Sequence, residues 1–186
     1  MEIANSATRT KYPLSTKKVI KKTFAQMLVL LVLFVVIYAF LSFTIISALP
    51  QQFNFYWFLL TVCLTALFGL VFLVVYLYQR WYYAIYYYEF ANDFIVIRKG
   101  PITPREITVP YERIQDVYVD QDFLDRLFGL YDVHLSSATA SSGAMAHIDG
   151  VEKAAADGLR ADLLDIVSKR ISRYKAHHSG TVSASQ

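Results

Sequence analysis

The chain has 186 residues, of which 55% are hydrophobic and 16% aromatic, and its formal net charge is +3. The positive charge lies in the first 22 residues, and the part from Arg80 onward is slightly acidic, which argues against a nucleic-acid-binding domain because such domains are strongly basic. The single cysteine, Cys63, excludes an intramolecular disulfide and a cysteine-based metal centre, and no residue pattern predicts a cofactor.

Residues 1–22 form a polar, basic segment that we predict to be disordered. Six Lys or Arg residues accompany one acidic residue, Glu2, and residues 1–16 have no hydrophobic periodicity. Four lysines precede the first apolar run, where each can interact with anionic lipid headgroups by about 1 kcal/mol: Lys17, Lys18, Lys21 and Lys22. They serve either to anchor the membrane topology or to bind a specific lipid in a regulated way.

Residues 23–79 contain no Asp, Glu, Lys, Arg or His and predict a hairpin of two transmembrane helices. The spans are expected at about 24–49 and 55–78, separated by Pro50 and the amides that follow it. Each run exceeds the roughly 20 residues that cross a hydrocarbon core. The short connection makes the two helices antiparallel.

The distribution of charge predicts the orientation of this hairpin. Basic residues flank its two outer ends, whereas the connection between the spans has none, so both termini are expected in the cytoplasm. We therefore expect a multi-pass protein of the inner, cytoplasmic membrane. A cleaved signal peptide is not expected, because the first apolar run is too long for one and a second span follows at once.

Thr61, Thr65 and Gly69 are spaced four residues apart and form a stripe of small side chains on one face of the second span. We expect this stripe to pack on the first span, with a second copy of the protein as the alternative. Neither span contains an ionisable Asp, Glu, Lys, Arg or His, so two helices alone provide no path for ions or protons.

Residues 80–175 are predicted to form one cytoplasmic α+β domain. Tyrosines crowd the exit of the second span, as in an interfacial aromatic belt, and their alternation after Trp81 predicts a first strand. Asp122 is the expected N-cap of a helical turn that ends at Gly129. Further short strands are expected at 94–98, 105–109, 117–121, 133–135 and 144–148.

The domain ends on a predicted amphipathic helix, followed by a disordered tail at 176–186. Asp149 and Glu152 have capping-box spacing, although Gly158 weakens the first turns and moves the firm start of the helix toward Asp157. Short strands followed by one such helix predict a small β-barrel whose open end the helix plugs. The whole chain is thus a membrane α-helical hairpin plus an α+β domain.

Three segments of this domain resemble a known family. They are FIVIRKG at 94–100, ITVPYERIQDV at 107–117 and RLFGL at 126–130. Together they look like the bacterial pleckstrin-homology-like (PH-like) domain of YdbS-like membrane proteins, a likeness that covers about 82–173 and extends to the hairpin before it. The resemblance implies a PH-like barrel capped by its C-terminal helix, and it implies no particular reaction.

The residues of these segments are expected to serve the architecture. The glycines allow positive φ, the proline ends a strand, and Leu127 and Phe128 fill the barrel. Gln115 either bonds buried backbone or contacts a partner. The full set is Gly100, Pro110, Tyr111, Ile114, Gln115, Leu127, Phe128 and Gly129.

A compact basic group, Arg98, Lys99 and Arg105, surrounds the turn after the second predicted strand. It is either a solvated turn or a contact with anionic lipid headgroups. PH domains that bind phosphoinositides carry basic residues around the first hairpin loop, whereas residues 91–93 here are Ala-Asn-Asp.

Catalysis is not expected. Strand alternation turns Asp116, Asp120 and His134 outward, and no serine lies in a nucleophile elbow. We expect a non-catalytic, membrane-anchored accessory or scaffold subunit for another membrane protein. An anionic-lipid-binding or membrane-sensing module is the alternative, and an oligomeric channel component is the third. The expected partners are membrane lipids and an unidentified membrane protein, with a homo-oligomer as a further alternative and no nucleic acid.

Overall fold

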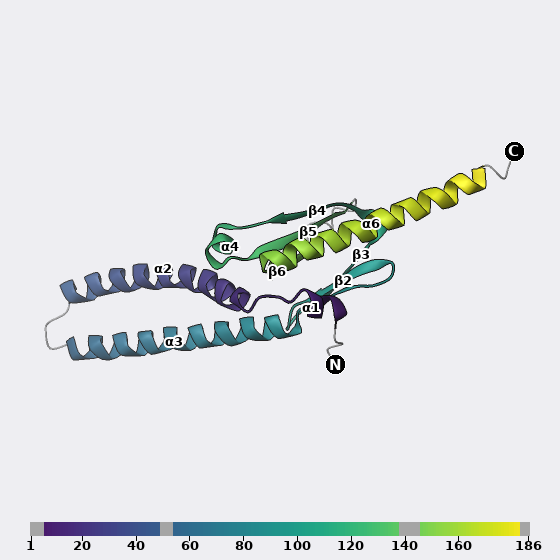
Figure 1. Ribbon diagram of the computed structural model, residues 1–186. Coiled ribbons are helices and arrows are strands. Elements are labelled where there is room, and N and C mark those ends of the chain that lie inside the picture. The colour runs from purple at the N-terminus through teal and green to yellow at the C-terminus, as the bar shows by residue number, and fades with distance from the viewer. Residues whose placement is uncertain (1–5, 49–53, 138–145, 183–186) are drawn as a thin grey trace. The chain divides into compact units, whose positions relative to one another are not determined.

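The computed structural model describes residues 6–48, 54–137 and 146–182. The chain divides into two compact units, which are considered separately. Residues Val19–Trp81 form one, here called the helical unit, and Met1–Lys18 together with Tyr82–Gln186 form the other, here called the sheet unit. Figure 1 shows the helices and strands of both.

The helical unit contains all but the ends of two antiparallel helices, α2 (Lys17–Ala48) and α3 (Asn54–Ile85). Gln79 Nε2 donates a hydrogen bond to Gln26 Oε1 at 3.0 Å, and the rings of Phe34 and Phe68 lie 5.0 Å apart. Both helices are long and apolar enough to cross a membrane, by length and composition. No residue of their most apolar stretches is buried within the protein, unlike the core helix of a soluble domain.

The second helix extends farther than the sequence predicted. The strand expected after Trp81 is wrong for residues 82–85, which belong to α3, and β1 (Tyr87–Phe90) begins beyond that helix. Tyrosine fits a helix or a strand, so the alternation does not mark the boundary. The end of α3 is capped from the N-terminal segment, since the Arg9 guanidinium donates to the carbonyl oxygens of Tyr83 and Ala84 at 3.1 and 3.3 Å.

In the described part of the sheet unit, six strands form two antiparallel sheets of three. The first has the order β1, β2 (Phe94–Lys99), β3 (Arg105–Pro110), and the second β4 (Ile114–Asp120), β5 (Tyr131–Ser137), β6 (His147–Val151). A short 3-10 turn, η2 (Tyr111–Arg113), joins them, and α4 (Phe123–Phe128) connects β4 to β5. In the described residues the sheets stay separate and open, so a closed barrel is not seen.

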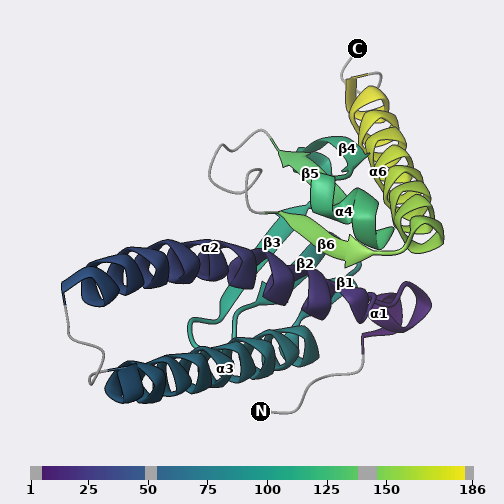
Figure 2. The same cartoon turned by 90° about the vertical axis from the view of Figure 1, so that its left-hand side faces the viewer.

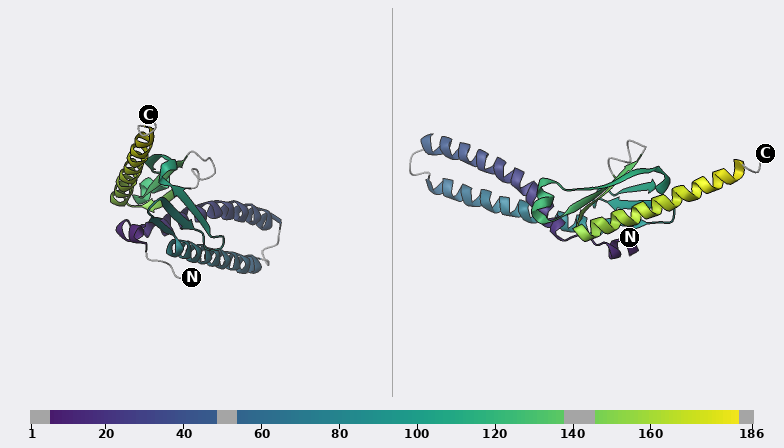
Figure 3. Two further views of the ribbon diagram at one scale, coloured as in Figure 1. Left: turned by 90° about the vertical axis from the view of Figure 1, so that its right-hand side faces the viewer. Right: turned by 45° about the horizontal axis from the view of Figure 1, so that its top comes forward.

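The C-terminal helix α6 (Lys153–Val182) follows β6 and runs beside the second sheet (Figures 2 and 3). The predicted capping box is wrong, because Asp149 lies within β6 and is buried. The helix also continues to Val182, past the predicted end of order at residue 175.

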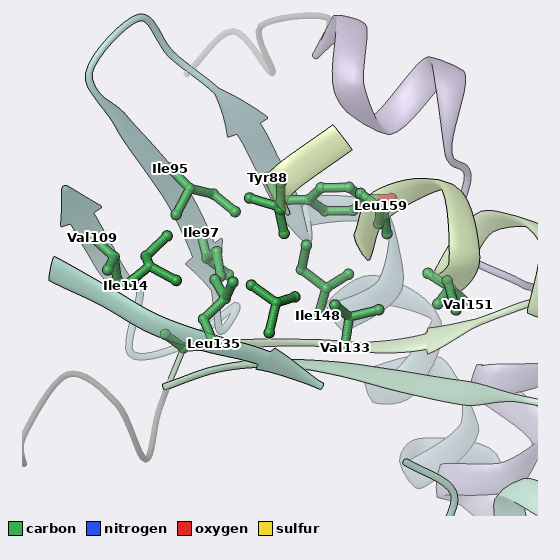
Figure 4. Packing of buried hydrophobic residues seen from close by; sticks show 14 of the residues in the cluster. Tyr88, Ile95, Ile97, Val109, Ile114, Val133, Leu135, Ile148, Val151 and Leu159 are labelled. Carbon is green, nitrogen blue, oxygen red and sulfur yellow. The ribbon is translucent and has the colours of Figure 1, made fainter. Parts of the chain in front are cut away.

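The core lies where the inner faces of the two sheets meet α6 (Figure 4). Ile95, Ile97 and Val109 of the first sheet are buried together with Val133, Leu135 and Ile148 of the second, and Leu159 closes the cluster from α6. Alternate residues of each strand supply this core, as expected for sheets with one solvated face. Full burial of each such side chain contributes about 1.5–3 kcal/mol.

The N-terminal segment differs most from its prediction. Disorder was expected for residues 1–22, but residues 6–22 are ordered, with α1 (Ala7–Lys11), a β-bridge at Leu14 and the first turns of α2. Its side chains satisfy backbone groups of the sheet unit, which a solvated tail would leave to water. Residues 1–5 lie outside the described range.

Candidate functional site

Residues 6–18, here called the N-terminal strap, run along the outer edge of β1. Ser6 Oγ donates to the carbonyl oxygen of Tyr88, and the amide of Phe90 donates to Thr8 Oγ1 at 3.0 Å. These bonds occupy backbone groups that an edge strand otherwise exposes. The free side of β1 is therefore covered by the protein's own chain.

The strap then reaches the edge of the second sheet. Leu14 forms an antiparallel bridge with Val151, and the amide of Ser15 donates to the carbonyl oxygen of Gly150 at 2.9 Å. The Leu14 side chain is buried in the core, and the Tyr83 hydroxyl donates to its carbonyl oxygen at 2.9 Å. The strap thus spans from the open edge of the first sheet to that of the second.

A third contact joins the strap to α6. Lys11 Nζ lies 2.6 Å from Asp162 Oδ2, and the Tyr12 hydroxyl donates to the same oxygen at 2.8 Å. The hydrogen bond to Asp162 raises the pKa of Lys11 to about 12, and the hydrogen bond from Lys11 lowers the pKa of Asp162. Gly158 admits the tyrosine ring, since a Cβ there would lie 2.3 Å from Tyr12 Cε1.

The strap ends on a buried ion pair. Lys18 Nζ lies 2.7 Å from Asp149 Oδ1, with 3% and 8% of the two side chains exposed, and it also lies 3.9 Å from the centre of the Tyr86 ring. Gly150 has φ +77°, and a Cβ there would lie 2.6 Å from Lys18 Cδ. Lys18 is therefore a buried structural residue, and its expected role as a lipid headgroup contact is wrong.

The other three lysines predicted to meet headgroups lie in different surroundings. Lys17 is half exposed and lies 3.8 Å from Glu152. Lys21 and Lys22 belong to the first turns of α2, where Lys21 is buried and Lys22 partly buried.

The predicted basic turn lies next to the end of α3. Tyr87, two residues beyond that helix, pairs with Arg98 of β2. Arg98 is bonded to Glu106 at 2.5 Å and Lys99 Nζ lies 3.4 Å from His147 Nε2, while the Arg105 side chain is exposed. The three residues therefore lie together as predicted, but one of their charges is neutralised within the protein.

The short helix α4 lies near Lys18. Carboxylate oxygens of Asp122, Asp125 and Asp132 lie within 4.8 Å of one another, and Asp132 accepts a 2.7 Å bond from the amide of Gly150, against which Lys18 is packed. Three carboxylates are a donor set for a hard cation. Here they serve the backbone, because Asp122 and Asp125 form a capping box at the start of α4.

The family-motif residues are architectural with two exceptions. Tyr111 is fully buried and donates to the carbonyl oxygen of Ala91 at 2.9 Å, and burial raises the pKa of its hydroxyl to about 12. Leu127 is 67% exposed and does not fill a barrel, while Gln115 is exposed at a bulge of β4. The others match their expected structural places: Gly100 and Gly129 with positive φ, Pro110 at the end of β3, Ile114 in the core and Phe128 partly buried.

Of the small-residue stripe expected to pack on the first span, only Thr61 contacts that helix. Thr61 is partly buried and its hydroxyl lies 3.3 Å from that of Tyr38, but Thr65 and Gly69 are exposed. A Cβ on Gly69 would meet nothing within 4 Å. The contact between the helices instead uses large aromatic residues such as Phe34 and Phe68.

A row of aromatic side chains on the second sheet was not predicted from the sequence. Tyr118, His134 and His147 occupy paired positions on three neighbouring strands. The ring centres of Tyr118 and His134 lie 5.0 Å apart and those of His134 and His147 lie 5.3 Å apart, and both pairs are stacked. His134 Nε2 lies 3.1 Å from Asp120 Oδ1. The outward direction of His134 and Asp120 was predicted by alternation, but their neighbours across the sheet depend on the register.

Comparison with known proteins places the chain in a family. A family model described as "Bacterial PH domain" matches residues 18–167, about four fifths of the chain. No curated protein and no solved structure matches the chain. The match includes both apolar helices, all six strands and the first half of α6, and it begins at the last residue of the strap. The chain therefore belongs to the bacterial PH domain family, in agreement with its resemblance to YdbS-like proteins.

Proposed function

We propose that this chain is a non-catalytic accessory or scaffold subunit of the bacterial inner membrane, where it presents its domain to another membrane protein. In this proposal α2 and α3 cross the membrane with both termini in the cytoplasm, and the two sheets with α6 form a PH-like fold. Support comes from the family match and from the two exposed apolar helices. PH-like domains are generally non-catalytic, which favours a binding role.

The observation that carries this proposal is the double attachment of the sheet unit to its apolar helices. Before α2 the strap is bonded to β6 and α6, and after α3 the chain enters β1 with the helix end capped by Arg9. Both connections are therefore ordered and hydrogen-bonded within the sheet unit itself. Such a domain is suited to hold a surface for a partner, and the exposed Gln115 supports a contact at β4.

The test is native mass spectrometry of the full-length protein, extracted from its own membrane into nanodiscs. We expect a second membrane protein at fixed stoichiometry. Gln115→Ala should reduce its occupancy, whereas Asp157→Asn, a change at an exposed site on α6, should leave it unchanged. A monomer or homo-oligomer without a second protein, under conditions that retain other membrane complexes, contradicts the accessory role.

A lipid-sensing role is the second candidate, favoured by the exposed Arg105 beside the exit of α3. The ion pair between Arg98 and Glu106 weakens this candidate, because it neutralises one of the basic side chains of the turn. In that case binding of anionic lipid to the full-length protein should weaken with salt and with Arg105→Gln. Retention of the same lipids by this variant contradicts it.

A further inference from the structure

Three large apolar side chains of the sheet unit are left uncovered. Phe123 is 83% exposed, Ile102 73% and Leu127 67%, the highest values among large hydrophobic residues in the described part of this unit. Phe123 and Leu127 are four residues apart on α4 and therefore share one face. Ile102 lies in the turn between β2 and β3.

Both segments that carry these side chains have a well-defined backbone, held by helix caps, hydrogen bonds or a tight turn. The capping box starts α4, Gly129 ends it in the left-handed conformation, and the amide of Leu130 donates to the carbonyl oxygen of Asp125 at 2.9 Å. Gln121 Nε2 adds a 2.7 Å bond to the carbonyl oxygen of Leu130. The β2–β3 turn is tight, since a Cβ on Gly100 would lie 2.4 Å from the Thr103 carbonyl oxygen. The exposed side chains are thus presented by formed structure.

Both segments also lie at the end of the sheet unit where the chain enters and leaves the apolar helices. The pairing of Tyr87 with Arg98 puts the β2–β3 turn beside the end of α3. Asp122 lies near Asp132, which bonds to the amide of Gly150, and Gly150 packs against Lys18. These contacts put α4 close to Lys18, in the first turn of α2. The opposite end carries the β1–β2 turn, where Arg170 of α6 bonds to Asn92 and Asp93.

We propose that α4 and the β2–β3 turn dock onto the interfacial region of the lipid bilayer, with Phe123, Leu127 and Ile102 as the inserting side chains. The bilayer is the occupant because the surface is continuous, through the chain itself, with helices apolar enough to span it. Large apolar residues with basic neighbours are typical of interfacial insertion, and here Lys99 and Arg105 flank Ile102 and the exposed Arg126 precedes Leu127.

The charges differ between the two segments. The turn is basic, whereas α4 has one exposed acidic residue at its N-cap, Asp122, and one exposed basic residue, Arg126, since Asp125 is buried. Insertion of α4 should therefore depend little on anionic lipid, while that of the turn should increase with it. This inference goes beyond the accessory role and needs no protein partner.

The experiment uses the full-length protein with Cys63→Ser and one new cysteine, from Phe123→Cys, Leu127→Cys or Ile102→Cys. An environment-sensitive fluorophore is attached, and the protein is reconstituted into vesicles of phosphatidylcholine and phosphatidylglycerol whose lipids carry a quencher near the headgroup. Asn92→Cys is the matched control, because it is exposed and lies at the opposite end of the unit.

We expect lipid quenching at positions 102, 123 and 127 to exceed that at position 92 several-fold. Equal quenching at all four positions overturns the proposal. Protection from aqueous iodide in native membranes, without lipid quenching in the purified vesicles, also overturns it and assigns this surface to a protein. Circular dichroism of each labelled variant confirms that the fold is retained, and the mass spectrometry above tests the accessory role independently.

Discussion

At the scale of single residues, Lys18 illustrates how a charge is kept inside a small domain. Its ammonium group lies against the Asp149 carboxylate and over the Tyr86 ring, and Gly150 leaves room for its methylene groups. A buried pair of this kind contributes little net stability compared with apolar residues, but removal of one partner is costly. The pair therefore holds the end of the strap, in the first turn of α2, against β6.

Lys18→Met should destabilise the sheet unit by about 3–5 kcal/mol, because it leaves the Asp149 carboxylate buried without its counter-ion. The measurement is urea unfolding of the full-length protein in detergent, followed by near-ultraviolet tyrosine circular dichroism. Lys17→Met is the matched control, since the ion pair of Lys17 is half exposed and contributes about 0–1 kcal/mol.

Adding Asp149→Asn to Lys18→Met should recover part of the loss, because the neutral amide carries no buried charge. Equal midpoints for Lys18→Met and Lys17→Met would show that the buried pair does not hold the strap.

At the scale of elements, the strap covers edges of two sheets that do not close into a barrel in the described residues. Each sheet has three strands and open edges, and the strap covers the free side of β1 and the free side of β6. It contributes Leu14 to the core and bonds through Tyr12 and Lys11 to α6. An uncovered edge strand invites pairing with another chain, so the strap also protects the domain from edge-to-edge association.

Gly158→Ala distinguishes local helix propensity from strap packing. Alanine should favour α6 by up to about 1 kcal/mol. Its Cβ would collide with the Tyr12 ring, however, so we expect the strap to be displaced. The measurement is hydrogen exchange of the Ser15 amide, which donates to Gly150 and should lose protection.

The control is the double variant that combines Gly158→Ala with Tyr12→Ala, because it has no tyrosine ring for the new Cβ to collide with. Its Ser15 amide should be as well protected from exchange as in the Tyr12→Ala variant alone. Unchanged protection of Ser15 in the single Gly158→Ala variant would contradict the role assigned to this close approach.

At the scale of the whole molecule, the distribution of charge and the pairing of the two chain ends predict how the helical hairpin is oriented in the membrane. The lysines in the first turns of α2 and Arg80 near the end of α3 flank the uncharged segment, and the sheet unit is built from chain on both outer sides of it. The strap and residues 82–186 pair with one another, so they must share one side of the membrane if α2 and α3 span it. Positive charge at both ends predicts that this side is the cytoplasm.

This orientation is tested in intact cells with a membrane-impermeant maleimide, on the Cys63→Ser background. Gln52→Cys, between the two helices, should react from outside, whereas Asn92→Cys should react only after the membrane is permeabilised. The reverse pattern would contradict the orientation, and reaction of both in intact cells would contradict a hairpin. A dye that crosses the membrane serves as the control for reactivity.

Some features could be predicted from the sequence to within one residue. The strands expected at 94–98 and 105–109 are β2 and β3, and the helical turn from Asp122 to Gly129 is α4. The two apolar helices are also where they were predicted, except that α2 begins earlier, at Lys17, and α3 continues to Ile85. These features depend on side chains a few residues apart, such as the alternation of a strand or the cap of a helix, and such patterns are visible in one dimension.

The role of the strap could not be predicted in the same way. Tyr12 and Leu14 are the only large apolar residues in its sequence, and their alternation is too short to indicate a bridge to β6. The family match does not help either, since it begins at residue 18. Charge alone predicts that the lysines of this region contact lipid. It cannot reveal that Lys18 pairs with the carboxylate of Asp149, 131 positions away in the chain.

The sequence by itself therefore determined the two apolar helices, the alternating strands of the domain and the family, because each is written in local spacing or in composition. Only the tertiary structure decided that Lys18 is buried, that Leu127 faces outward beside Phe123, and that two open sheets are joined by the N-terminal strap. Those outcomes depend on which distant segments meet. That is determined by burial of the shared core and by satisfaction of backbone groups at the sheet edges, neither of which has a local pattern.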